Sequence, residues 1–220
     1  MDGSHDRERP SVANQALPCG ALRRNGHASQ HGELNDRLRT MAEPLPADRA
    51  PSDLRWQLHK VTDKDRDLPD AKMIVMAAIL MSEAFRDVAS GFDLGESQFI
   101  EAPLYEAKSM TRMGEVEPDP ERRDPRRWFL FHILPRKAAL MPEASRGVSP
   151  NEWPNGSIHW SVNVPGTPDI VLSLAAIGGP DVWHDPALMG TIFFSDRFER
   201  AIKAAKLRTP AFVFKPCRVA

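Results

Sequence analysis

A strand–helix–strand pattern occurs twice in this 220-residue sequence, and no other feature limits the possible folds as strongly. Each copy opens with an apolar run that leads into a serine, Ser82 in the first copy and Ser195 in the second. Apolar residues then recur at the i, i+3, i+4 and i+7 positions that form one face of an α-helix. A shorter apolar run, typical of a strand, follows each helix.

The two copies align without a gap at an offset of 113 residues, the separation of Ser82 and Ser195. The matched pairs are Ile79 and Ile192, Phe85 and Phe198, Leu94 and Leu207, Phe99 and Phe212, and Pro103 and Pro216. Serine is a favoured N-cap residue, and Glu83 suits the positive end of a helix dipole. We therefore predict that a helix starts directly after each serine, and that strands return at Gln98–Ile100 and Phe212–Phe214.

The rest of the chain adds strands that are separated mainly by loops. Alternating apolar residues predict a strand at Leu54–Leu58, and apolar runs predict strands at Trp128–Leu134 and Ile170–Leu174. The 20 prolines favour short elements and long ordered loops. Such an order of elements indicates an α+β fold and not a doubly wound one. The expected architecture is a mixed or antiparallel sheet with two duplicated strand–helix–strand units.

Residues 1–53 have neither the helical nor the strand period, and three prolines interrupt their end. Such a segment buries too little apolar surface to offset the entropy of ordering it. We predict a disordered or loosely attached N-terminal arm over 1–53, with a possible short helix at Glu33–Met41, and a single α+β domain over 54–220. Met41 is an alternative to Met1 as the true start, because foldable sequence begins soon after it.

Composition and charge exclude several classes of protein. The net charge of −1 gives no general attraction to nucleic acid or to anionic lipid. The sequence opens without an apolar signal segment, and its longest apolar run, Met73–Met81, is too short to cross a bilayer. The only two cysteines, Cys19 and Cys217, fit free thiols in a reducing compartment. We expect a cytoplasmic protein that binds neither nucleic acid nor a membrane.

The candidate catalytic residues all have a plainer structural interpretation. Ser82 and Ser195 lack the small neighbours of a nucleophile elbow, and helix capping explains both. His184, with Asp185 or Asp181, could form an acid–base pair, but a loop histidine beside a carboxylate is usually structural. The sequence has no Gly-rich phosphate loop and no cluster of metal ligands, so we expect no cofactor and no metal. The chain is predicted not to be an enzyme.

Two features favour binding to another protein. Acidic residues alternate with Val and Pro in the order Glu115, Glu117, Asp119 and Glu121, so their charge suits a basic partner. Trp153 and Trp183 lie in expected loops, and tryptophan is over-represented at interface hot spots. These six residues are the candidate contacts, although a solvated loop and closure of the core are the plainer alternatives.

The segments Ile79–Pro103 and Gly190–Pro216 resemble the immunity protein 11 family of bacterial polymorphic-toxin systems. The likeness rests on an apolar strand, a serine-capped helix and a returning strand in each segment, and it extends loosely over 54–220. It implies an immunity-type protein that binds and neutralises a cognate protein toxin, encoded by the adjacent gene. It implies no catalytic residues and leaves the activity of the toxin open.

Two further functions remain as alternatives. One is an uncharacterised enzyme that uses His184 with Asp185 or Asp181. The other is a structural domain that forms homo-oligomers through the Trp- and Pro-rich region between Pro142 and Pro168.

Overall fold

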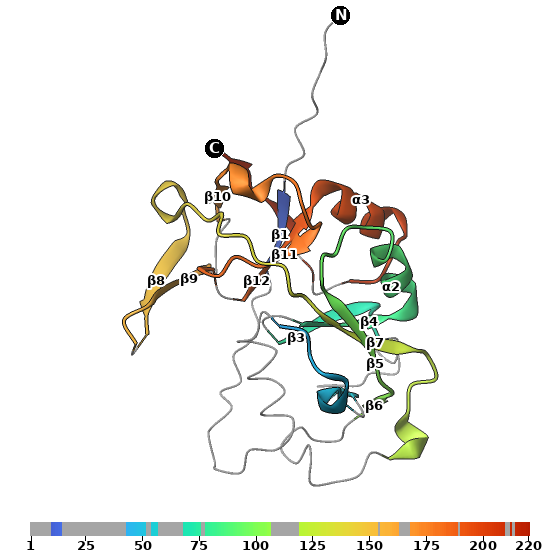
Figure 1. Ribbon diagram of the computed structural model, residues 1–220. Helices are drawn as coiled ribbons and strands as arrows, with labels where there is room; N and C mark the ends of the chain where they lie inside the picture. Colours follow the sequence, from blue (N-terminus) through green and yellow to red (C-terminus); the bar gives the residue numbers. More distant parts are fainter. Residues whose placement is uncertain are drawn as a thin grey trace, which may run out of the picture.

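The computed structural model describes residues 10–14, 43–51, 54–56, 68–75, 78–106, 119–153, 155–162, 168–188, 190–209, 212 and 214–220. Over these residues the protein is a mixed α+β structure with two α-helices and several small, mostly antiparallel sheets (Figure 1), so the expected fold class is confirmed. The described residues also include four 3₁₀ turns, η1 Ala47–Arg49, η2 Pro120–Arg122, η3 Pro142–Ala144 and η4 Leu174–Ala176.

The first copy of the pattern lies in a four-stranded sheet. Its strands are β3 (Ala71–Val75), β4 (Ala78–Ser82), β7 (Trp128–His132) and β5 (Gln98–Glu101), in that order across the sheet. All three pairings are antiparallel. Helix α2 (Glu83–Ala89) starts directly after Ser82, as predicted.

The second copy lies in another four-stranded sheet. Its strands are β11 (Val182–Trp183), β12 (Thr191–Ser195), β1 (Pro10–Asn14) and β13 (Phe214–Pro216), in that order. The pairings are again antiparallel. Helix α3 (Asp196–Ala204) starts directly after Ser195, which confirms the second predicted helix.

The two sheets share one pairing scheme, and we call Asp70–Glu101 with β7 the first unit and Asp181–Pro216 with β1 the second unit. In the first unit β3 pairs with β4, the strand before the helix, and β7 lies between β4 and the returning strand β5. In the second unit β11 pairs with β12, and β1 lies between β12 and the returning strand β13. The offset of 113 holds up to the helix and becomes 115 after it, because α3 is two residues longer than α2. The returning strand of the second unit therefore begins at Phe214, the counterpart of Phe99, and not at the predicted Phe212.

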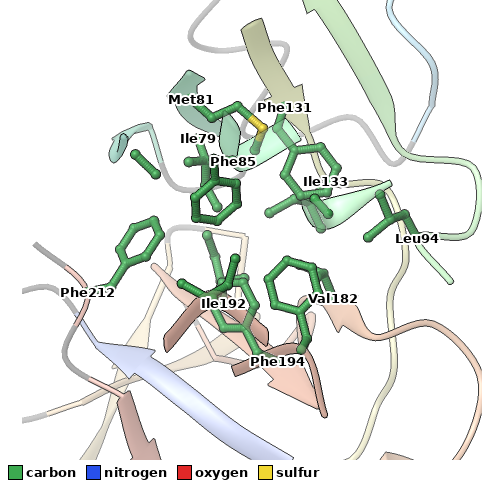
Figure 2. Close-up of a cluster of buried hydrophobic side chains, with 14 of the residues drawn as sticks. Ile79, Met81, Phe85, Leu94, Phe131, Ile133, Val182, Ile192, Phe194 and Phe212 are labelled. Atoms are coloured by element: carbon green, nitrogen blue, oxygen red, sulfur yellow. The ribbon is translucent and has the colours of Figure 1, made fainter. Parts of the chain in front are cut away.

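The main hydrophobic core lies between the two units. Figure 2 shows Ile79, Met81 and Phe85 of the first unit facing Ile192 and Phe194 of the second, all of them buried. The helices meet in the same core, with the Phe85 and Phe198 ring centroids 6.3 Å apart. Burial of these large side chains, each contributing on the order of 2 kcal/mol, holds the units together.

The remaining strands of the described part of the chain form three small sheets. Strands β2 (Leu54–Trp56) and β6 (Leu104–Glu106) are parallel, as are β10 (Val171–Leu172) and β14 (Arg218–Val219). Strands β8 (Val148–Glu152) and β9 (Ile158–Val162) form an antiparallel hairpin that projects from the side of the molecule (Figure 1).

The apolar run Met73–Met81 contributes to two antiparallel strands, β3 and β4. The residues Pro10–Asn14, expected in a disordered or loosely attached arm, form the central strand β1, because backbone pairing on both sides compensates for their weak strand propensity. The possible helix at Glu33–Met41 lies outside the described residues. Within the described part of the chain, none of the helices has the length and apolar character needed to span a membrane.

Candidate functional site

Neither candidate serine is a free nucleophile. The Ser82 Oγ accepts a hydrogen bond from the Phe85 N–H at 3.3 Å and donates one to the Asp70 carboxylate at 2.9 Å. The Ser195 Oγ accepts from the Phe198 N–H at 3.2 Å and donates to the Asp181 carboxylate. Both hydroxyls therefore cap a helix, as the sequence predicts, and both are held by an aspartate.

These two aspartates join the units reciprocally. Asp70 directly precedes β3, and its backbone N–H and Oδ2 pair with the carbonyl and N–H of Arg208, past the end of α3, at 2.7 and 2.8 Å. Asp181 directly precedes β11 and pairs in the same way with Asp93, past the end of α2, at 2.6 and 2.9 Å. Arg208 and Asp93 each lie four residues beyond their helix. We call this arrangement the aspartate clasp.

The groups around the Asp181 carboxylate determine its charge state. Burial raises the pKa of this carboxyl, but hydrogen bonds from Arg197, Ser195 and the Asp93 N–H outweigh it, so the pKa lies below its usual range. The Arg197 guanidinium donates to both carboxylate oxygens, at 2.6 and 2.7 Å. Asp181 is therefore an ionised structural group with its acceptor sites occupied, which makes it a poor general base.

His184 and Asp185 are also engaged inside the protein. The His184 Nδ1 donates to the Thr191 carbonyl at 2.9 Å, and burial, with the nearby Arg136, lowers its pKa to about 3. The Asp185 carboxylate accepts from the backbone N–H groups of Ala139, Leu140 and Ala187 at 2.6–2.8 Å. The pair fits a neutral core histidine and a carboxylate that organises a loop. Among the described residues, no group of three or more His, Cys, Asp or Glu side chains could hold a metal ion.

The acidic series is only partly described, since Glu115 and Glu117 lie outside the described residues. Asp119 and Glu121 are exposed at the start of η2, where the Asp119 carboxylate accepts from the Glu121 N–H at 3.1 Å. Arg122 lies 3.5 Å from Asp119 and offsets part of its charge. The turn η2, yellow-green in Figure 1, lies on the opposite side of the view from β8 and β9, so the structure does not bring the acidic residues together with Trp153.

Trp183 is not at the surface. Its side chain is 1% exposed, stacks on Phe193 with ring centroids 4.2 Å apart, and has the Lys137 Nζ 4.9 Å from its ring. The core therefore takes up the whole indole, which offers no contact area to a partner in this structure. Trp183 therefore fits the alternative interpretation, in which the tryptophan closes the hydrophobic core.

Trp153 lies at the tip of the β8–β9 hairpin. The Trp153 N–H donates to the Ser157 carbonyl at 2.9 Å, and the Gly156 N–H donates to the Trp153 carbonyl at 2.8 Å. Gly156 takes a φ of +78°, which favours glycine, and the Asn155 side chain accepts from the Ser157 N–H at 3.0 Å. These bonds fix the tip, so Trp153 is presented on an ordered turn.

The tip carries three apolar or aromatic side chains, Trp153, Ile158 and His159, which we call the hairpin tip. Trp153 and His159 lie together on one face of the hairpin, and Ile158 lies beside Glu152 on the other. The Trp153 and His159 rings lie 4.6 Å apart, and the His159 Nε2 is 3.1 Å from the Ser157 hydroxyl. Ile158 is 59% exposed. The tip carries little charge, since Glu152 is the one acidic residue on the described part of the hairpin.

The base of the hairpin is anchored to the body. The Trp160 N–H donates to the Ala187 carbonyl at 2.6 Å, and Val148, Trp160 and Val162 pack against a second buried cluster around Leu172 and Phe193. An isolated two-stranded hairpin is marginally stable in water, so this anchoring is what allows the tip to project.

Sequence reasoning found Trp153 but missed Ile158 and His159. The available signal was Asn155-Gly156, a turn dipeptide between the apolar positions of a hairpin. Pro150 obscured the strand that precedes this turn, because a proline usually argues against the interior of a strand.

Comparison with known proteins leaves the chain unassigned. No family model matches it. No curated protein matches it either.

Proposed function

We propose that this protein is an immunity protein, which binds a cognate bacterial toxin and neutralises it by direct docking. The observation that carries the proposal is the hairpin tip, an ordered turn on the projecting hairpin that carries the half-buried Trp153 and the exposed Ile158. Aromatic anchors on rigid turns give contact area at a low cost in conformational entropy. The resemblance of Ile79–Pro103 and Gly190–Pro216 to immunity protein 11 indicates which kind of protein the partner would be.

The engagement of the polar candidates supports binding over catalysis. Both serine hydroxyls cap helices, and the carboxylates of Asp181 and Asp185 accept hydrogen bonds from backbone, serine and arginine groups. A general base needs a free position within reach of the proton that it removes. These residues instead stabilise the scaffold that carries the tip.

We infer further that the two units are copies of one motif, joined by the aspartate clasp. Their matching order of elements and matching Ser–Asp hydrogen bonds support this interpretation. Duplication gives a rigid two-sheet body, which suits a protein whose work is to hold a contact surface in place.

The proposal is tested by co-expression with the product of the neighbouring gene. We expect the two proteins to purify as a one-to-one complex, and Trp153→Ala to weaken it roughly thirtyfold, the loss of a central aromatic anchor. Ile158→Ser should weaken it by a smaller factor. Titration calorimetry of each variant measures the dissociation constant.

Leu174→Ser is the matched control, because Leu174 is 69% exposed but lies on η4 and not on the hairpin. It should leave affinity unchanged. Equal weakening by Ile158→Ser and Leu174→Ser would show that the hairpin tip is not the contact. If the neighbour's product forms no complex with the unaltered protein, the toxin–immunity assignment itself fails.

A further inference from the structure

The central strand of the second unit comes from a remote part of the chain. In the first unit, β7 lies between β4 and β5, and it is separated from β5 by fewer than thirty residues. In the second unit the same position, which we call the strand slot, lies between β12 and β13 and holds β1, residues Pro10–Asn14 (Figure 1). The matching registers place Leu130 and Val12 at equivalent points, opposite Leu80 and Phe193 respectively.

The occupant of the slot is poorly suited to a central strand. β7 has the sequence Trp-Phe-Leu-Phe-His, and all five of its residues are buried. β1 has the sequence Pro-Ser-Val-Ala-Asn. Proline has no N–H to donate to a ladder, and alanine and asparagine are depleted in strands. Val12 is the one β-branched aliphatic residue that β1 offers.

The walls of the slot, by contrast, are strongly apolar. Thr191, Ile192, Phe193 and Phe194 of β12 are all buried, and Phe214 of β13 packs against the main core. By the equivalence of the two units, a strand with large apolar side chains at the Ser11 and Ala13 positions would match Phe129 and Phe131 of β7. The slot therefore suits a different strand better than the one that it holds.

We propose that the strand slot is a β-augmentation site, in which β1 is an exchangeable occupant and an extended apolar segment of a partner protein is the alternative one. Main-chain hydrogen bonds to β12 and β13 would hold either strand, and the side chains would set the preference. β1 competes as part of the same chain, so an incoming segment must pair more strongly than β1 does. The identity of the partner as a toxin rests on the proposed function, but the slot itself does not.

The test uses the full chain with Val12→Cys and Lys215→Cys, which are directly opposed in the β1–β13 pairing, in a Cys19→Ser background. The separation of opposed residues in an antiparallel pair is within reach of a disulfide. The probes are two fluorescein-labelled peptides. One reproduces residues 8–16, and the other carries Ser11→Phe and Ala13→Phe. Fluorescence anisotropy measures their binding to the oxidised and the reduced protein.

We expect the reduced protein to bind the phenylalanine peptide, and to bind it roughly tenfold more tightly than the natural peptide, since each aromatic cross-strand pair adds affinity. The oxidised protein should bind neither. Val12→Pro in the full chain should bind the phenylalanine peptide more tightly than the unaltered protein, whereas Ala16→Pro, outside β1, should not.

Equal binding to the oxidised and reduced protein would place the peptide elsewhere and overturn the proposal, and so would a phenylalanine peptide that binds no better than the natural one. A disulfide that links two chains, seen as a doubled mass on a non-reducing gel, would assign the slot to a second copy and not to a partner's segment. Because only peptides are used, these results are independent of whether the neighbouring gene encodes a toxin.

Discussion

At the scale of single residues, the polar side chains that look most reactive are structural. Ser82, Ser195 and Asp185 each satisfy backbone N–H groups that would otherwise lack a partner. Cys217 is likewise buried, and burial raises the pKa of its thiol to about 12, so it stays protonated. A reactive group must be accessible to solvent or substrate and must not have its hydrogen-bonding positions occupied, and these residues do not meet that condition.

The buried His184 makes stability depend on pH. The unfolded histidine gains a proton near pH 6.5, whereas the folded one does so only near pH 3. The unfolded state therefore binds more protons between these values, and the contribution of His184 to stability, complete above pH 6.5, is lost as the pH falls. We expect the free energy of unfolding to fall by about 2 kcal/mol from this residue between pH 6.5 and pH 5.

Urea unfolding at several pH values measures this effect. His184→Gln should flatten the slope between pH 6.5 and pH 5, and His159→Gln on the hairpin should preserve it. An unchanged slope in His184→Gln would mean that another group causes the dependence.

At the scale of elements, local sequence signals predicted the helices well and the hairpin poorly. A serine followed by a helical apolar face is a local pattern, so α2 and α3 start where the sequence predicts. The later start of β13, at Phe214, depends on the length of α3, and neither a capping residue nor the apolar periodicity in the sequence defines where that helix ends. The β8–β9 hairpin has mixed polarity because none of its described residues is fully buried, so strand alternation is weak there.

Removing either cap should destabilise the protein without affecting partner binding. Ser82→Ala and Ser195→Ala each lose an N-cap and a hydrogen bond to an aspartate, so we expect about 1–2 kcal/mol of destabilisation from each. Ser90→Ala is the control, since the exposed Ser90 hydroxyl bonds only a carbonyl at the end of α2. Chemical denaturation and titration calorimetry report the two effects. If Ser195→Ala lost its function while keeping full stability, the result would support Ser195 as a nucleophile.

At the scale of the whole molecule, the two units are coupled by the core and by the clasp. The strand before each helix is predictable, but the reciprocal pairing of Asp70 with Arg208 and of Asp181 with Asp93 is not. These contacts join residues 138 and 88 positions apart, and no local pattern carries such information. For the same reason the pairing of β1 with β12 could not be foreseen.

We therefore expect the units to unfold together. Asp181→Asn should lower the free energy of unfolding by about 2 kcal/mol, because it removes a charge-assisted network at a buried site. Asp169→Asn, which affects an exposed pair with Arg218, should leave it nearly unchanged. Circular dichroism and tryptophan fluorescence should show one coincident transition for both variants. Separate transitions in the unaltered protein would contradict this coupling, and separate transitions in Asp181→Asn alone would mean that the clasp, and not the core, couples the units.

The β8–β9 hairpin has an anchored base and a projecting tip, so selection for folding acts on the base and selection for recognition acts on the tip. Substitutions at Trp153 or Ile158 change a surface that no core contact depends on, whereas Val148, Trp160 and Val162 are constrained by packing. Descendants of such a protein can therefore diversify at the turn while their scaffold is inherited intact. Recognition would evolve quickly there, and at little risk to folding.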